Sequence, residues 1–405
     1  MPTKYATRQQ FRRRLTFVIT TVLFASLVAS HIKNSIKTFG LNRRVPLVLT
    51  SFEGRVSLSF DVKVLDSTKF LVDQLASRFL IQEPFRCLLV SPSIFQDGEV
   101  YFRTLCEQRS KGGFSFISKS QLRERRLNGV DIIGALPPSF ISLEENGFED
   151  CRGFEWKYNR YLICSVQTGI SERKMSFVSV SELRSYPVKT AGIDLLKVEK
   201  NWTPLVWQDI LFLIYSFSPL VVLECEKRLD YFYCEVVYKE TGDVVTEATI
   251  LRGGTPCIWL RRNQFFCFCH GRWVEEGRRS SKSEVETEKE DSYFYRGIVV
   301  VLQVYPFRIL SVSSPLKLFP SLCSSRISRK SVEYPTGIAQ FDDTLLLGVH
   351  FHDEVSYIFE VSNLVAQLNT LQFDYGLNVS TVEAYLESHK GSVIRNTKWC
   401  GSDML

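Results

Sequence analysis

Five segments of this chain repeat one pattern: a short polar motif, an apolar stretch, a turn and a second, strongly apolar stretch. A repeat of this kind constrains the fold more than any other sequence feature, because it means that one supersecondary unit is used several times. The motifs and the stretches that close their units are Ser91-Pro92-Ser93-Ile94 with residues 100–105, Glu149-Asp150-Cys151-Arg152 with 161–166, Glu199-Lys200-Asn201-Trp202-Thr203-Pro204 with 210–215, Arg252-Gly253-Gly254-Thr255-Pro256 with 265–270, and Pro335-Thr336-Gly337-Ile338-Ala339 with 344–350.

The spacing of the motifs predicts an all-β fold. Successive motifs begin 58, 50, 53 and 83 residues apart, and the last interval contains a charged run at 275–291 that we interpret as a loop. Units of about fifty residues made of short strands are typical of β-propeller blades, each a four-stranded sheet beside a central channel. We therefore expect a five-bladed β-propeller over residues 51–390 rather than a two-sheet β-sandwich. Helices are expected only at 67–80 and 380–389.

The motif residues differ in type from one unit to the next. Equivalent strands of a propeller line one channel, so the motifs of all five units should converge at one mouth of it. Carboxylates, cations, an amide and an indole in one place are typical of a sugar site, where Trp202 would stack on a sugar ring and Asn201 would bond its hydroxyl groups. The repeat therefore predicts one shared site.

The first 52 residues contain nine basic side chains and no acidic one. Residues 15–30 carry no charge and follow Arg12-Arg13-Arg14, which favours a cytoplasmic N-terminus and a lumenal body. Sixteen residues span roughly 24 Å as a helix, enough for a thin endomembrane. We expect a type II signal anchor, with a cleaved signal peptide, an organelle transit peptide or a buried core helix as alternatives. The expected order is a basic tail (1–14), this segment (15–30), a linker (31–50), the propeller (51–390) and a C-terminal tail (391–405).

The basic character of the chain is confined to that N-terminal segment. The whole chain has 50 basic and 44 acidic side chains, so residues 53–405 keep 41 basic and all 44 acidic ones. Binding along a nucleic-acid backbone needs a basic face. We therefore do not expect nucleic acid as a partner.

Eleven cysteines lie after residue 80, and none belongs to a Cys-X-X-Cys pair. Cys267 and Cys269 alternate within an apolar strand, where buried structural thiols are expected rather than zinc ligands. His350 and His352 also lack a clear third ligand, so no metal site is expected. In a lumenal body some cysteines would form disulfides, and Asn378-Val379-Ser380 would be a usable N-glycosylation sequon.

The ordered set of motifs resembles the family of inverting β-mannoside phosphorylases, glycoside hydrolase family 130, and its mannosyltransferase relatives. The resemblance covers roughly residues 85–360 and implies the same five-bladed fold. It rests on Pro92-Ser93-Ile94, Glu149-Asp150-x-Arg152, Glu199-Lys200-Asn201-Trp202-x-Pro204, Gly253-Gly254-Thr255-Pro256 before a strand ending in His270, and Thr336-Gly337-Ile338-Ala339 with the later Asp353.

The resemblance implies a role for each matching residue. Asp150 would be the catalytic acid that protonates the leaving glycosidic oxygen, by relay through a sugar hydroxyl. Arg103, Lys200 and His270 match positions expected near the phosphate. The other matching residues would bind the glycosyl group or orient the acid: Glu149, Arg152, Asn201, Trp202, Thr255 and Asp353.

One carboxylate is sufficient for this chemistry. Glycoside hydrolysis needs two carboxylates, and Glu199 is the one motif candidate for the second. If inorganic phosphate is the nucleophile, a cationic pocket takes the place of that second group. In the reverse direction, the same site transfers a mannosyl group from mannose 1-phosphate or a nucleotide sugar to an acceptor. Phosphate or a sugar phosphate is thus expected as a co-substrate, and no cofactor.

A type II anchor with a lumenal domain is the layout of enzymes that build glycans in the Golgi or endoplasmic reticulum membrane. We therefore expect a glycosyltransferase of the secretory pathway, bound to the membrane through residues 15–30 and acting on glycans or small sugars. The alternatives are a phosphorylase or hydrolase of β-mannosides, and a catalytically inactive glycan-binding propeller. A secreted protein is the alternative location.

Overall fold

The computed structural model describes most of the chain after residue 41. The described residues are 42–67, 86–108, 112–123, 126–132, 147–169, 171–241, 250–275, 292–318, 322–324, 330–351, 355–373, 375–395 and 397–399. The chain divides into two units, Met1–Asn42 and Arg43–Leu405, and the strands and helices that the structure describes lie in the second, apart from Asn42. Strands predominate and the helices are short, which confirms the predicted all-β fold.

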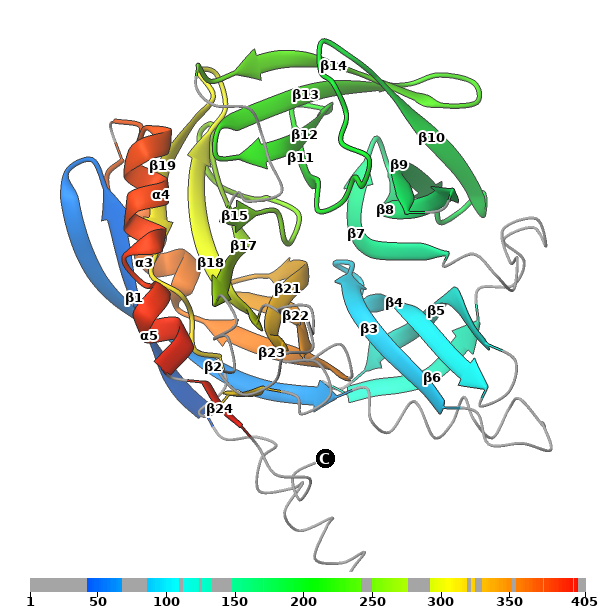
Figure 1. Ribbon diagram of the computed structural model, residues 1–405, viewed down its shortest axis with the longest axis horizontal. Coiled ribbons are helices and arrows are strands. Elements are labelled where there is room, and N and C mark those ends of the chain that lie inside the picture. Colours follow the sequence, from blue (N-terminus) through cyan, green and yellow to red (C-terminus); the bar gives the residue numbers. More distant parts are fainter. Residues whose placement is uncertain are drawn as a thin grey trace, which may run out of the picture. The chain divides into compact units, whose positions relative to one another are not determined.

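Five groups of antiparallel strands follow one another along the described part of the chain (Figure 1). The first group is a separate sheet in the order β3-β4-β5-β6. Its strands are β3 (Arg86–Ile94), β4 (Glu99–Gln108), β5 (Gly112–Arg123) and β6 (Arg126–Ile132).

The second and third groups form one eight-stranded sheet. Each group is an antiparallel series of four strands, and the two series meet where β10 pairs in parallel with β14, with Val188 opposite Phe232. The strands are β7 (Phe148–Trp156), β8 (Asn159–Gly169), β9 (Glu172–Ser179), β10 (Arg184–Ala191), β11 (Thr203–Trp207), β12 (Ile210–Phe217), β13 (Leu220–Lys227) and β14 (Phe232–Lys239).

The fourth and fifth groups belong to a ten-stranded sheet that joins both ends of the described chain. In the fifth group, β2 pairs with β23, so an N-terminal strand completes a sheet of C-terminal strands, with Asp61 opposite Ser362. The strands are β15 (Leu251–Arg252), β16 (Ile258–Arg261), β17 (Gln264–Glu275), β18 (Ser292–Gln303), β19 (Arg308–Ser313), β21 (Lys330–Phe341), β22 (Thr344–Phe351), β23 (Val355–Ser362), β1 (Asn42–Ser51) and β2 (Gly54–Ser67).

Three short helices follow β23 in the described chain: α3 (Leu364–Thr370), α4 (Val379–Glu387) and α5 (Lys390–Arg395). The side chain of Asn378 caps α4 by accepting a hydrogen bond from the Thr381 backbone N–H, which confirms the helix predicted at 380–389. A two-stranded sheet joins β20 (Leu322–Ser324) to β24 (Thr397–Trp399). The helix expected at 67–80 lies outside the described residues, except for Ser67 at the end of β2.

The five predicted hairpins are all present, as β3–β4, β7–β8, β11–β12, β16–β17 and β21–β22. Three of the preceding motifs contain a non-glycine residue with left-handed backbone: Ser91 (φ 53°), Asp150 (φ 50°) and Asn201 (φ 66°). The strand register also shifts at the first two of these positions. Because a bulge re-aims a side chain away from the regular pleat, the motifs break the strand pattern at equivalent places.

Other motif residues bond one strand group to the next. The Ser93 hydroxyl of the first group donates to the Cys151 carbonyl of the second (3.0 Å). The Thr336 hydroxyl of the fifth group donates to the Pro92 carbonyl of the first (2.8 Å). The fifth group therefore contacts the first directly, and part of the repeated pattern serves this packing.

The two glycines of the fourth motif are required by close approach of other backbone, of the third group at Gly253 and of β17 at Gly254. A Cβ atom on Gly253 would lie 2.0 Å from the Asn201 carbonyl oxygen, which leaves no room for a larger residue. The Gly254 backbone N–H donates to the Thr203 hydroxyl at 3.3 Å. This loop thus holds Asn201 against the fourth group.

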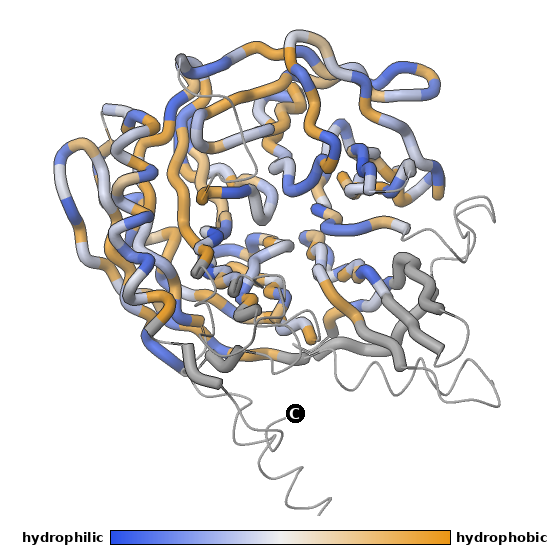
Figure 2. Tube along the Cα trace, viewed as in Figure 1, coloured by the Kyte–Doolittle hydropathy of each residue, from blue (hydrophilic) through white to orange (hydrophobic). Residues whose placement is uncertain are grey.

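β18 separates two hydrophobic cores. Ile298, Val300 and Leu302 point into one core, and Val299 and Val301 point into the other, all with 0% exposure. A strand buried on both faces is continuously apolar rather than alternating, and Figure 2 shows this stretch as hydrophobic.

The structure corrects two predicted boundaries. β1 lies partly within the predicted linker (31–50), because Val45, Leu47 and Leu49 are 0–1% exposed and alternate with more exposed neighbours, as on a strand with one buried face. The predicted C-terminal tail (391–405) contains most of α5, the strand β24 and the buried Val393. The ordered body therefore extends further at both ends than the sequence pattern indicated.

Residues 15–30 and 276–291 lie outside the described residues. Among the helices that the structure describes, none is long and apolar enough to cross a membrane.

Two disulfides join neighbouring strands in the described part of the chain. Cys151 on β7 is bonded to Cys164 on β8, and Cys225 on β13 is bonded to Cys234 on β14. Both link strands that are already hydrogen-bonded to each other.

Candidate active site

Arg152 lies where three of the strand groups meet. Its guanidinium is fully buried and donates from Nη2 to the Asn201 side-chain oxygen (3.1 Å) and to the Tyr334 hydroxyl (2.6 Å). A further bond runs from Nη1 to the Cys151 carbonyl (3.1 Å), and the Tyr334 hydroxyl donates to the same Asn201 oxygen (2.8 Å). Residues of the second, third and fifth groups thus form one hydrogen-bonded cluster.

Asp150 faces this cluster from the bulge of the second motif. Burial raises the pKa of Asp150, but the positive charges of Arg152, Lys200 and Arg103 and a hydrogen bond with Tyr334 outweigh it. Together they lower the pKa of Asp150 to about 2. The carboxyl group is therefore ionised at neutral pH and surrounded by cations.

Glu149 holds two arginines beside this site. Its carboxylate pairs with Arg103 through Oε1 (2.8 Å) and with Arg173 through Oε2 (3.0 Å). Arg103 comes from β4 of the first group and Arg173 from β9 of the second, so this acid links two groups. Glu149 therefore positions cations rather than substrate in this structure.

His270 enters the site from the end of the apolar run of β17. It is 2% exposed, and its ring centroid is 4.5 Å from that of Tyr334, edge to face. Burial lowers the pKa of His270, and the charges of Arg252 and Arg152 lower it further, to about 3. The imidazole is thus neutral at physiological pH, and its Nδ1 is buried without a hydrogen-bond partner among the described residues.

The first strand group contributes Ser91, whose hydroxyl lies 3.5 Å from Nδ1 of His350. The His350 ring centroid is 6.0 Å from that of Tyr334. All five groups therefore supply residues to one place. Of the residues predicted for the site, the structure brings together Arg103, Glu149, Asp150, Arg152, Lys200, Asn201 and His270.

Trp202 does not occupy the predicted position beside a sugar. It is 1% exposed, packs edge to face on Tyr215 at 5.2 Å, and donates its indole N–H to Glu199 Oε2 at 2.9 Å. The side chain belongs to a buried hydrophobic cluster. The prediction that Trp202 stacks on a sugar ring is therefore replaced by a structural role.

Glu199 is bonded to neutral donors rather than to the cationic cluster. It accepts hydrogen bonds from the Trp202 indole, the Tyr215 hydroxyl (3.2 Å) and the Leu196 backbone N–H. Burial raises the pKa of Glu199, and these hydrogen bonds only partly offset the effect. Its oxygens are thus engaged in holding the third motif together.

Thr255 also has a structural role. It is fully buried, donates to the Pro256 carbonyl (2.9 Å) and accepts from the Phe268 backbone N–H (3.1 Å). The predicted sugar contact of Thr255 is corrected accordingly, because its hydroxyl is already satisfied by the chain. Asp353 and His352 lie outside the described residues.

Two residues of the site were not identified from the sequence. Tyr334 comes immediately before the Pro335-Thr336-Gly337 motif, and this adjacency is the signal that could have identified it. Arg173 belongs to no motif and is brought to Glu149 only by the pairing of β8 with β9.

The site has more positive than negative charge. Five cations (Arg103, Arg152, Arg173, Lys200 and Arg252) surround two carboxylates (Glu149 and Asp150). An excess of fixed cations around one ionised carboxylate favours binding of a phosphate next to a group that can exchange a proton. The described residues hold no cluster of three or more His, Cys, Asp or Glu side chains suited to a metal ion.

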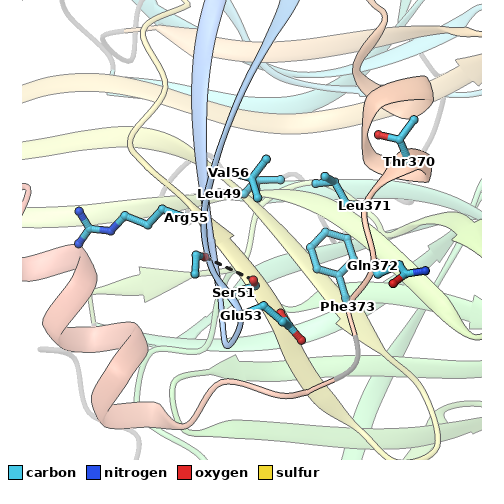
Figure 3. Close-up of a pocket in the computed structure, with 10 residues that line it drawn as sticks. Leu49, Ser51, Glu53, Arg55, Val56, Thr370, Leu371, Gln372 and Phe373 are labelled. Carbon is cyan, nitrogen blue, oxygen red and sulfur yellow. Dashed lines mark hydrogen bonds between the residues drawn. The ribbon is translucent and has the colours of Figure 1, made fainter.

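A separate pocket of about 340 Å³ lies between the β1–β2 hairpin and the segment after α3 (Figure 3). Figure 3 shows Arg55 extending away from Phe373, and its guanidinium lies 5.6 Å from the ring centroid of Tyr385. None of the motif residues lines this pocket, whose lining is Leu49, Ser51, Glu53, Gly54, Arg55, Val56, Thr370, Leu371, Gln372 and Phe373. It has no group of like charges and is not the candidate site.

No protein-family model matches this chain. Among curated proteins, the chain is 39% identical over 70 residues to β-mannosyltransferase 2 of Komagataella phaffii. This match covers 16% of the chain and only 11% of the length of that relative.

Several solved structures resemble the chain. A glycoside hydrolase of Parabacteroides distasonis has a TM-score of 0.49 at 12% identity, over 72% of this chain and 89% of that one. A GDP-Man-dependent mannosyltransferase of Leishmania mexicana has a TM-score of 0.47 at 10% identity, over 76% and 98%. A β-1,2-mannobiose phosphorylase of Listeria innocua has a TM-score of 0.39 at 10% identity, over 76% and 94%. These similar structures include one mannoside phosphorylase and one mannosyltransferase.

Proposed function

We propose that this protein is a glycosyltransferase that moves a mannosyl group from a sugar phosphate or nucleotide sugar to a glycan acceptor, with inversion at the anomeric carbon. The observation that carries the proposal is one carboxylate among several cations: Asp150 lies close to Arg103, Arg152 and Lys200. The local similarity to a β-mannosyltransferase supports mannose as the transferred sugar.

The charge of Asp150 suits the synthetic direction. Its ionised carboxylate would accept the proton of an acceptor hydroxyl while that oxygen bonds to the anomeric carbon and the bond from carbon to the donor phosphate breaks. The negative charge that develops on the leaving phosphate would be stabilised by the nearby guanidinium and ammonium groups. One acid and a set of cations are sufficient for this step.

Binding of the donor would also change the pKa of Asp150. A bound phosphate places negative charge beside Lys200 and Arg103, which offsets their effect on the carboxylate, so the pKa of Asp150 would rise. In the phosphorolytic direction, with inorganic phosphate bound, the group could then hold a proton and release it to the leaving glycosidic oxygen. The same residue would thus serve both directions.

We assign positioning roles to the residues around Asp150. Tyr334 hydrogen-bonds with Asp150, and Arg152 is held by Tyr334 and Asn201. His270, being neutral, would exchange hydrogen bonds with a sugar hydroxyl rather than add charge for the phosphate. This replaces part of the phosphate-binding role predicted for His270.

We further propose that the five strand groups are the blades of a β-propeller. The contacts of the fifth group with the first support a closed ring, as does the completion of the β21-β22-β23 sheet by β2. In Figure 1 the first strands of the groups lie toward the middle of the described body and the last strands toward its outside. The motifs, which lie on or just before the first strands, would then surround one channel mouth.

We place the catalytic body in the lumen of the secretory pathway, either anchored through residues 15–30 or secreted. Two disulfides favour an oxidising compartment. Asn378 is exposed at the N-terminal cap of α4, so the sequon at 378–380 can carry a glycan without disturbing the core. If the native protein carries a glycan that a glycosidase removes, and Asn378→Gln lacks this added mass, the lumenal location is supported. If the native protein carries no glycan and is digested by protease added to intact vesicles, the lumenal location is refuted.

The proposed reaction is tested by offering the purified chain mannose 1-phosphate or GDP-mannose, each with a panel of mannose-containing acceptors. We expect a lengthened acceptor together with release of phosphate or GDP, and the released species identifies the donor. Heat-denatured protein is the control. Glycan binding without turnover of either donor would instead identify a non-catalytic propeller.

Phosphorolysis is the second candidate, because the same cations can hold inorganic phosphate as the attacking group. It predicts that β-mannosides are consumed only when phosphate is added, with mannose 1-phosphate as product. Hydrolysis is less well supported, because the motif acid Glu199 is engaged with Trp202 and Tyr215 instead of facing Asp150.

A further inference from the structure

Three thiols meet beside the fourth motif, outside the chemistry proposed above. Cys257, Cys267 and Cys269 are the free cysteines of the described chain. The sulfur atoms of Cys267 and Cys269 are 3.5 Å apart and fully buried, while Cys257 is only partly buried and is hydrogen-bonded to Cys267. Three nucleophilic groups this close can exchange partners when they are oxidised.

Strand geometry decides which two of the three can bond. Cys267 and Cys269 are two positions apart on β17, roughly 6.6 Å between Cα atoms, with side chains pointing in the same direction. That separation is at the upper limit of about 6.8 Å for a disulfide. A bond between these two is therefore disfavoured, and Cys257 must be one of the partners.

The register of β16 and β17 selects Cys267 as the other partner. Ile258 pairs with Phe266 in this antiparallel pair, so the next position places Cys257 opposite Cys267. The existing disulfide on β13 and β14 has the same relation, because Cys225 lies directly opposite Cys234 with Cα atoms 4.1 Å apart. Cys257 and Cys267 of the fourth group are thus placed across two strands in the same way as the disulfide-bonded Cys225 and Cys234.

We propose that Cys257 and Cys267 form a disulfide across β16 and β17 under oxidising conditions, and that Cys269 remains a thiol. The chain has eleven cysteines, an odd number, so at least one cannot pair within the chain. Whether this bond forms in the cell depends on the oxidising compartment proposed above, whereas its formation in the purified protein does not.

The oxidant would be a protein or small-molecule disulfide. Burial and the hydrogen bond with Cys267 raise the pKa of Cys257, but Cys257 is the only partly exposed thiol of the three and therefore the one that an oxidant can reach. Once deprotonated, it attacks the oxidant, forming a mixed disulfide and releasing one thiol. The Cys267 thiolate then attacks the Cys257 sulfur, forming the internal bond and releasing the second thiol, so two protein thiols are oxidised and one disulfide is reduced. Hydrogen bonds with the Cys257 and Cys269 thiols lower the pKa of Cys267 against the effect of burial, which favours this attack.

This bond would fix the loop that holds the candidate site. Cys257 ends the segment that begins with Gly253 and Gly254 and leads into β16. A Cβ on Gly254 would lie 2.9 Å from the Cys269 Cα, and one on Gly253 would lie 2.0 Å from the Asn201 carbonyl oxygen. Linking Cys257 to Cys267 therefore restrains the loop against both β17 and Asn201.

The test is a disulfide map of the full chain. The purified protein is reduced, reoxidised with oxidised glutathione, alkylated with iodoacetamide in denaturant without further reduction so that buried thiols also react, and digested with trypsin and chymotrypsin. Cleavage after Phe268 separates Cys267 from Cys269. We expect a peptide containing Cys257 linked to one containing Cys267, and complete alkylation of Cys269.

The Cys225–Cys234 disulfide provides an internal control for reoxidation. If that bond re-forms while Cys257 and Cys267 are both alkylated, or if Cys257 is linked to Cys269, the proposal is overturned. Cys269→Ser should keep the Cys257–Cys267 link, and loss of the link in this variant would also count against it. Because the map does not depend on turnover, a negative result leaves the proposed reaction untouched.

Discussion

The second and third motifs both contain an acid and a left-handed residue, yet their carboxylates have opposite environments. Asp150 faces Arg152, Lys200 and Arg103, and its pKa is lowered. Glu199 accepts hydrogen bonds from Trp202 and from other uncharged donors in a core, and its pKa is raised by burial. Two similar segments thus place one carboxylate among cations and the other among uncharged donors.

The difference shows that neighbouring charges, rather than the motif itself, decide what a carboxylate can do. A carboxylate among cations is ionised and can exchange a proton with a substrate, whereas a carboxylate among neutral donors mainly organises the chain around it. The sequence repeats the acid, but the cations near Asp150 come from three different strand groups.

The strongest test of this comparison is Asp150→Asn. We expect mannosyl transfer to fall by about 10²–10⁴-fold, the usual contribution of a general acid or base, with glycan binding retained. Initial rates at saturating donor and calorimetric titration of the acceptor measure the two effects. The exposed Asp194→Asn is the matched control, which should leave the rate unchanged.

A rate for Asp150→Asn within threefold of the native protein would show that this carboxylate is structural after all. In that case the contrast with Glu199 would disappear, and both motifs would have to be regarded as packing elements.

The second test is Tyr334→Phe, which removes the hydroxyl shared by Asp150, Arg152 and Asn201. Loss of a hydrogen bond to a charged group costs about 1.5–3 kcal/mol, so we expect roughly a 10- to 100-fold fall in rate. The hydrogen bond also lowers the pKa of Asp150. The acid limb of the pH–rate profile should therefore move to higher pH, whereas a purely structural role would leave it in place.

The hairpins could be predicted because their signals are local. Turn residues such as Gln96-Asp97-Gly98 and Asp342-Asp343 separate apolar runs, and β3–β4 and β21–β22 form around them. The pairing of β2 with β23 has no such signal, since its partners lie at opposite ends of the chain.

The candidate site was only partly predictable for a related reason. A tryptophan beside polar residues can stack on a sugar or fill a core, and only the packing of Tyr215 against Trp202 decides between them. Arg173 reaches Glu149 through strand pairing alone. The sequence identified the polar residues of the motifs but not which of them face one another.

The third test is Glu199→Gln, which should affect stability rather than chemistry. The new amide N–H₂ would face the donors of Trp202, Tyr215 and the Leu196 backbone, leaving one of them unsatisfied. We expect a loss of about 1–3 kcal/mol in the free energy of unfolding. Urea denaturation should show a lower midpoint with an unchanged slope, while the rate per folded molecule stays within threefold. A large loss of rate without loss of stability would contradict this assignment.

The smallest expected effect is a difference in how the stability of the Asp150 and Glu199 variants depends on pH. The pKa of Asp150 is lowered in the folded protein, so its stabilisation is present above about pH 3.9 and is lost as the pH falls, by roughly 1 kcal/mol between pH 5 and 3. The pKa of Glu199 is raised, so its contribution is present at low pH and is lost as the pH rises. In urea titrations at pH 5 and pH 3, the stability deficit of Asp150→Asn should therefore narrow at pH 3, and that of Glu199→Gln should widen. Deficits that move in the same direction would mean that the two acids share one environment.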